Sequence, residues 1–79
     1  MFNQRTLDRL RAQAWHLPEM RLPLAMGVAR NPGAFSPTER TTARRLLQIE
    51  SAKAISSDDL HKYQEMASSI TIHERGERQ

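Results

Sequence analysis

The stretch SPTERTTARRLLQIESAKAI, residues 36–55, decides the fold. It opens with the capping box Ser36-Pro37-Thr38-Glu39, in which a serine hydroxyl and a glutamate carboxylate each pair with the other residue's backbone N–H. Proline suits the first helical position, where its missing N–H leaves nothing unpaired. The apolar residues that follow recur at helical spacing, so the sequence predicts a long helix over residues 37–55.

Apolar and polar residues separate onto two sides of this predicted helix. The apolar arc contains Leu46, Ala43, Leu47, Ile49 and Ala54. The opposite, solvent-facing half contains Arg40, Arg44, Thr41 and Gln48. Glu50 falls near the centre of the apolar arc. We expect a neighbouring arginine or histidine to neutralise it, and a functional carboxylate is the less favoured alternative.

Two further helices are predicted before this segment. Residues 3–16 form the first, with a hydrophobic staple in which Asn3 is the N-cap and Phe2 packs on Leu7. Its apolar stripe is Leu7, Leu10, Ala14 and Leu17. Trp15 lies beside the stripe, either as a core-edge residue or as the anchor of a binding surface. Pro23 would break a helix begun at Pro18, so the second helix is predicted only over residues 23–30. Residues 31–34, Asn-Pro-Gly-Ala, match a type II turn.

The fourth predicted helix covers residues 57–69 and opens on serine and aspartate residues that favour a helix N-terminus. Residues 70–72, Ile-Thr-Ile, alternate like a strand and are left open as helix, extended tail or a strand added to a partner. We therefore predict one all-α domain over residues 1–72, a small bundle of four helices, and a short, flexible polar tail over residues 73–79.

Composition excludes several classes of protein. With 79 residues there is room for one small core, and with no cysteine neither a disulfide nor a thiolate metal site can form. The three histidines fit no metal-ligand spacing, and the three glycines form no phosphate loop. The expectation is a non-enzyme without cofactor or metal. No apolar run is long enough for a membrane span, which predicts no membrane partner and a cytoplasmic location.

Charge is distributed unevenly along the chain, whose formal net charge is +3. Nine basic and four acidic residues occupy residues 1–55, a net of +5, whereas residues 56–79 have a net of −2. Most of the bases are arginines, which pair well with carboxylates and phosphates. The first hypothesis is therefore a small modulator, an adaptor or inhibitor, that binds an acidic protein surface. Its size also suits a protein encoded on a phage or other mobile element.

The alternative is a nucleic-acid-binding regulator that uses Arg40, Arg44 and Arg45 on the long helix. The candidate partner-binding residues for either function are Arg40, Arg44, Arg45, Gln48, Arg5, Arg9 and Trp15. Several large apolar residues also exceed what a minimal core hides, namely Phe2, Trp15, Met20, Phe35, Met66 and Ile72. They predict either a homodimer or simply a completed core.

Overall fold

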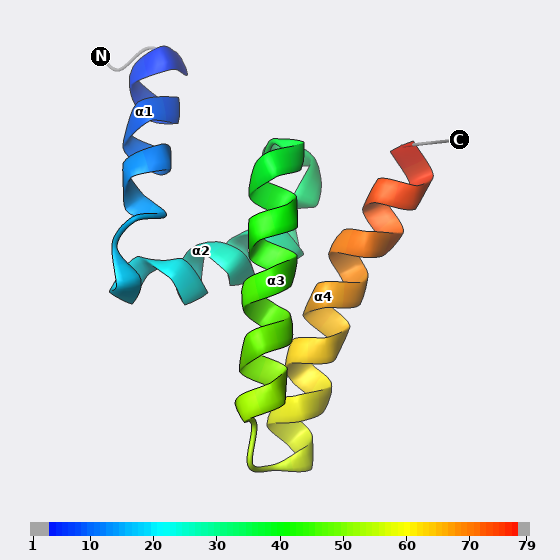
Figure 1. Cartoon of the computed structure of the whole chain (residues 1–79). Helices are drawn as coiled ribbons and strands as arrows, with labels where there is room; N and C mark the ends of the chain where they lie inside the picture. Colours follow the sequence, from blue (N-terminus) through cyan, green and yellow to red (C-terminus); the bar gives the residue numbers. More distant parts are fainter. Residues whose placement is uncertain (1–3, 78–79) are drawn as a thin grey trace.

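The computed structural model describes residues 4–77, which contain four α-helices and no strand (Figure 1). The α-helices are α1 (Gln4–Ala14), α2 (Pro18–Arg30), α3 (Pro37–Lys53) and α4 (Ser57–Glu77), with a 3₁₀ helix, η1 (Pro32–Ala34), between α2 and α3. The predicted all-α bundle of four helices is therefore confirmed. The proposed staple of Phe2 and Asn3 lies outside the described residues.

The core lies where α2, α3 and α4 meet. α3 and α4 form an antiparallel hairpin, α2 crosses behind it, and α1 stands beside α3 (Figure 1). The buried apolar residues are mostly small: Ala25, Val28, Ala29, Ala43, Leu47, Ala67 and Ile70. Alanine lets helix backbones approach closely but buries little apolar area, so this core contributes modestly to stability. α1 contributes none of these buried residues.

The capping box forms as predicted and starts α3. Ser36 Oγ accepts a hydrogen bond from the Glu39 N–H at 3.2 Å, and Glu39 Oε1 accepts one from the Ser36 N–H at 3.1 Å. α3 ends at Lys53, two residues before the predicted end, and Ala54 adopts an extended conformation. Ile55, predicted to be the last residue of this helix, instead lies in the connection to α4.

The prediction that Pro23 prevents a helix from starting at Pro18 is wrong. α2 runs through Pro23, and Pro18 occupies its first turn. Pro23 removes one backbone hydrogen bond and strains the preceding turn. The packing of Ala25, Val28 and Ala29 in the core offsets that cost. Tertiary contacts therefore override the local preference for a break.

The predicted turn after α2 is also wrong in type. A type II turn needs a positive φ at its third residue, and no glycine among the described residues has one. Residues 32–34 instead form η1, with Ala34 N–H donating to Asn31 O at 3.0 Å and Phe35 N–H donating to Pro32 O at 3.2 Å. This tighter turn leads directly into the cap of α3.

The fourth helix is longer than predicted. α4 continues from Ser57 to Glu77, so residues 70–72 are helical and residues 73–77 form no separate tail. Ile70 is fully buried in the core, and the carboxylates of Glu74 and Glu77 pair with Arg40 on α3. These contacts order the polar end of the helix.

We expect Ser36→Ala to lower the free energy of unfolding by about 1 kcal/mol, because the Glu39 N–H loses its acceptor. For a domain of this size, that is a fall of about 4–8 °C in the midpoint of a thermal melt followed by circular dichroism. Thr38→Ala, an exposed change within the same helical turn, is the control and should leave the midpoint nearly unchanged. Equal midpoints for Ser36→Ala and the wild type would contradict the role of the cap.

Candidate functional site

The predicted basic face of α3 is not an open surface. Arg40, expected on the solvent side, is only 5% exposed. Its Nη1 donates to the carbonyl oxygens of Phe35 at 2.9 Å and Pro32 at 3.3 Å. The guanidinium therefore fixes η1 and the start of α3, and a buried cation in this position needs acidic partners.

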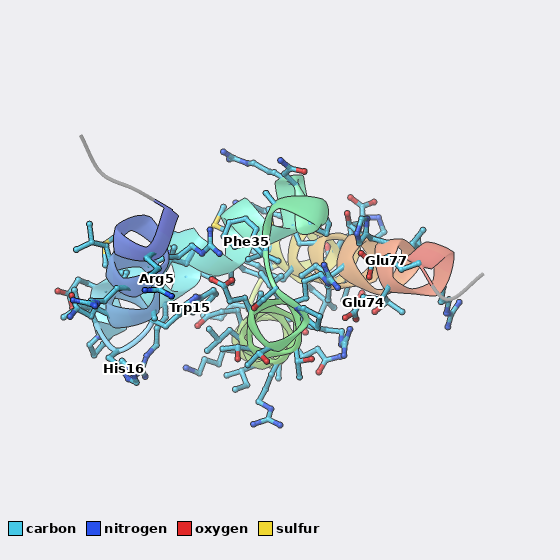
Figure 2. All side chains as sticks on the ribbon, turned by 90° about the horizontal axis from the view of Figure 1, so that it is seen from above. Arg5, Trp15, His16, Phe35, Glu74 and Glu77 are labelled. Carbon is cyan, nitrogen blue, oxygen red and sulfur yellow. The ribbon has the colours of Figure 1, made fainter. Side chains whose placement is uncertain are left out.

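Those partners come from the end of α4. Glu77 Oε2 lies 2.8 Å from Arg40 Nη2, and Glu74 Oε2 lies 3.5 Å from Arg40 Nε. Arg44 Nη1 also pairs with Glu74. Figure 2 places both glutamates on the last turns of α4. We call Arg40, Arg44, Glu74 and Glu77 the arginine–glutamate cluster. It joins α3, η1 and α4, and each of the two arginines is paired with a carboxylate of α4.

The cluster also changes the acidity of Glu74. The hydrogen bond from Arg44 lowers the pKa of Glu74, and this effect outweighs the rise due to burial. The positive charges of Arg44 and Arg40 and the hydrogen bond from Arg40 lower it further. The carboxylate is therefore charged well below neutral pH, as an ion-pair partner requires.

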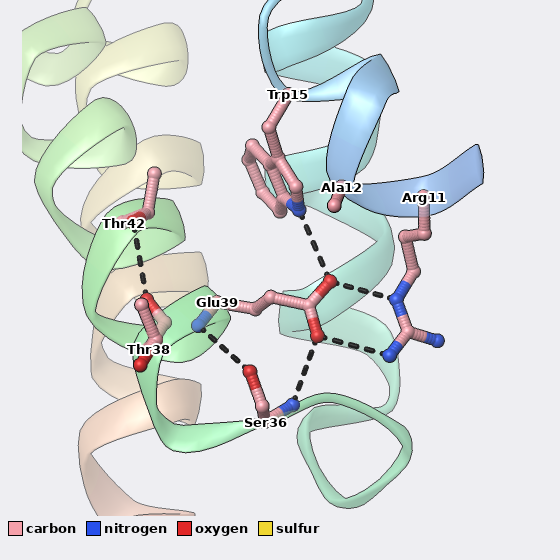
Figure 3. Close-up of a pocket in the computed structure, with 7 residues that line it drawn as sticks. All are labelled: Arg11, Ala12, Trp15, Ser36, Thr38, Glu39 and Thr42. Carbon is pink, nitrogen blue, oxygen red and sulfur yellow. Dashed lines mark hydrogen bonds and ion pairs between the residues drawn. The ribbon is translucent and has the colours of Figure 1, made fainter. Parts of the chain in front are cut away.

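A second cluster surrounds Glu39 and joins α1 to α3 (Figure 3). Arg11 donates to both carboxylate oxygens, from Nε at 2.7 Å and from Nη2 at 3.0 Å. The Trp15 indole N–H donates to Oε2 at 3.1 Å. Trp15, expected as a core-edge residue or as a binding anchor, thus uses this N–H to bind Glu39. The Arg11 guanidinium also lies over the Phe35 ring, 5.0 Å from its centroid.

Burial raises the pKa of Glu39, but its hydrogen bonds together outweigh burial, so the net pKa is lowered. In order of their effect, these hydrogen bonds involve the backbone N–H of Ser36, the indole of Trp15, the guanidinium of Arg11 and the side chain of Ser36. Around this carboxylate lies a cleft of about 440 Å³ between α1 and α3, lined by Arg11, Ala12, Trp15, Ser36, Thr38, Glu39 and Thr42. Both oxygens of Glu39 already accept hydrogen bonds, so the carboxylate holds the helices together and is not poised for chemistry.

The corner between α1 and α2 carries Leu10 and Leu17, which the sequence assigned to an apolar stripe, and Met20, which it counted as exceeding the core. Leu10, Leu17 and Met20 are between 39% and 48% exposed. Arg5 and Arg9, also exposed, form no ion pair with a side chain that the structure describes. Arg21 donates to the backbone carbonyl of Trp15 at 3.0 Å and remains exposed. We call this surface, Leu10, Leu17 and Met20 with Arg5, Arg9 and Arg21, the corner.

The structure divides the predicted binding residues among separate places. Arg40 and Arg44 belong to the arginine–glutamate cluster, and Trp15 is half-buried against Glu39. Arg45 and Gln48 are exposed on α3, whereas Arg5 and Arg9 belong to α1. The sequence singled out Met20 as an apolar residue in excess of the core, but it missed Leu10 and Leu17 as surface residues, because helical spacing alone does not show whether a stripe finds a partner. Glu50, expected beside an arginine or histidine, is half-buried and lies 3.9 Å from Lys53 Nζ.

Within residues 4–77, no group of three or more histidine or acidic side chains could hold a metal ion. Over the same residues, no helix has the length and apolar character needed to cross a membrane. In three comparisons, the chain matches no family model, no curated protein and no solved structure. The functional argument therefore depends on the geometry of the chain itself.

We expect Arg40→Ala to destabilise the fold by about 3 kcal/mol, because it leaves two carbonyls and two carboxylates without their shared donor. Urea denaturation followed by circular dichroism measures this change. Arg45→Ala, on the same helix but exposed, is the matched control and should change stability by less than about 0.5 kcal/mol. Similar stabilities for the two variants would show that Arg40 is not a structural residue.

We expect Glu39→Gln to loosen α1 from α3, because the amide keeps the shape but loses the charge that attracts Arg11. Trp15 is the single tryptophan of the chain, so its emission reports this contact directly and should move to longer wavelength. Ser36→Ala, which disrupts the cap but retains the carboxylate, is the control and should leave the emission in place.

The lowered pKa of Glu39 sets the direction of the pH dependence. Its stabilising contribution is complete at neutral pH and is lost as the pH falls from the ordinary glutamate value of 4.5 toward the lowered value. The emission of Trp15 should therefore shift on acidification in the wild type. An identical acid transition of the emission in Glu39→Gln would contradict this assignment.

Proposed function

We propose that the chain is a small protein-binding modulator, an adaptor or inhibitor, that contacts its partner through the corner. The observation that supports this is the exposure of Leu10, Leu17 and Met20 in the same short segment as the exposed Arg5 and Arg9. Exposed apolar residues interspersed with arginines fit a protein surface whose apolar patch is edged by carboxylates. The partner is thus defined by its chemistry, an acidic rim around an apolar patch.

The geometry favours a protein over nucleic acid as the partner. Backbone binding to nucleic acid needs several free cations along one face. Arg40 and Arg44, two of the three arginines that the nucleic-acid hypothesis needs, are neutralised by Glu74 and Glu77. The corner also exposes three apolar side chains, and burying apolar side chains against a charged phosphate backbone gains little free energy.

The proposed modulator binds without catalysing a reaction. Glu39 and Glu74 are the described residues with lowered pKa values, and both are engaged by structural donors. A catalytic acid or base needs a pKa near the working pH and an open path to substrate. Neither carboxylate meets that requirement, so the geometry supports occlusion or bridging of a partner as the mode of action.

Affinity capture from the source cell, with wild-type protein and with Leu17→Ser as bait, tests this proposal. Leu17 occupies the N-cap of α2, where serine is a preferred residue, so the variant removes apolar surface without weakening the helix. We expect specific proteins, identified by mass spectrometry, to be retained by the wild type after nuclease treatment and lost from Leu17→Ser.

The control bait is Ile72→Ser, which changes an exposed apolar residue of α4 away from the corner. It should retain the same proteins as the wild type. The proposal is overturned if Leu17→Ser captures the same proteins as the wild type. It is also overturned if nuclease removes everything that was captured, because the partner would then be nucleic acid.

A further inference from the structure

A second apolar surface lies at the connection between α3 and α4. Ile55 is fully exposed there, at 102% of its reference area, and Ile49 and Leu60 are also exposed. Asp58 and Asp59, both exposed, follow directly in the first turn of α4. We call this surface, Ile49, Ile55 and Leu60 with Asp58 and Asp59, the turn. Beside it lies a cleft of about 220 Å³ lined by Glu50, Lys53, Ala54, Ile55, Asp59 and Tyr63.

The corner and the turn are complementary in charge. Residues 5–21 contain Arg11, which Glu39 neutralises, and three further arginines against Asp8 and Glu19, a formal net of +1 outside that pair. Residues 49–60 contain Glu50, Asp58 and Asp59 against Lys53, a formal net of −2. Each surface also presents three large exposed apolar residues. Exposed apolar residues accompanied by opposite charges are what a specific interface combines.

One chain cannot join these two surfaces to each other. Figure 1 shows the corner between α1 and α2 and the connection between α3 and α4 at different ends of the molecule. Contact between two corners would oppose arginines with arginines, and contact between two turns would oppose aspartates with aspartates. The pairing that satisfies both charge and apolar burial is a corner on the turn of another copy.

We propose that the chain self-associates head to tail, with the corner of one copy on the turn of the next. The contact is heterologous, so an unused corner remains at one end of the assembly and an unused turn at the other, and assembly continues with concentration unless a ring closes. Opposite charges steer the contact, which should weaken as salt screens them. The inference does not depend on the proposed cellular partner, because the purified chain alone tests it.

Sedimentation of the purified protein tests the proposal. We expect the average mass of the wild type to rise above 9.1 kDa with concentration, up to about 1 mM, and to fall again with added salt. Leu10→Glu places an acid in the basic corner, and Ile55→Lys places a base at the acidic turn. Both positions are exposed, so the fold tolerates the changes, and each variant alone should remain monomeric.

An equimolar mixture of the two variants distinguishes head-to-tail contact from any symmetric one. The intact turn of Leu10→Glu meets the intact corner of Ile55→Lys, and growth stops there, so the mixture should form a 1:1 dimer. Ile72→Lys makes the same kind of change at an exposed residue outside both surfaces and should associate like the wild type.

Three results would overturn the proposal. The first is a wild type that stays at 9.1 kDa at every concentration. The second is a mixture of Leu10→Glu and Ile55→Lys that remains monomeric although the wild type associates. The third is loss of association in Ile72→Lys to the same degree as in Ile55→Lys. None of these results bears on capture of a cellular partner, so the two proposals fail independently.

Discussion

The carboxylate of Glu39 both begins α3 and holds α1. Its Oε1 closes the capping box with Ser36, and the same carboxylate receives Arg11 and Trp15 from α1. None of the α1 side chains that the structure describes is buried in the core, and Trp15, directly after α1, packs against the edge of that core. The polar contacts to Glu39 therefore help to place α1 beside α3. Charge-assisted hydrogen bonds are directional, and they therefore fix the angle of a helix that apolar packing alone would leave undetermined.

The charge asymmetry of the sequence is partly satisfied within the molecule. The basic N-terminal portion supplies Arg40 and Arg44, and the acidic C-terminal portion supplies Glu74 and Glu77 to neutralise them. These pairs join α3 and α4 toward the end where the two helices diverge (Figure 1). A surplus of arginine thus does not by itself imply an anionic ligand, because a small domain with few large apolar residues also uses arginine to join its helices.

Local signals in the sequence predicted the parts of the fold that depend on neighbouring residues. The capping box of α3 joins two residues that are three positions apart, and the sequence predicts both of its hydrogen bonds. The errors concern interactions across the chain. Arg40 reaches Glu74 and Glu77, 34 and 37 residues away, and periodicity contains no information on such pairs. The same holds for α2, where core packing overrides Pro23, and for Leu10 and Leu17, whose stripe has the right spacing but no partner inside the molecule.

Three arginines have structural roles, so fewer residues remain as candidates for a functional surface. Arg11, Arg40 and Arg44 hold helices together, so changes at these positions test the fold and not a binding face. What remains at the corner is a set of exposed apolar residues and exposed arginines in α1 and the first turns of α2. These side chains are engaged in none of the ion pairs between helices that the structure describes, which is why we propose the corner as the surface that meets another protein, whether a cellular partner or a second copy of the chain.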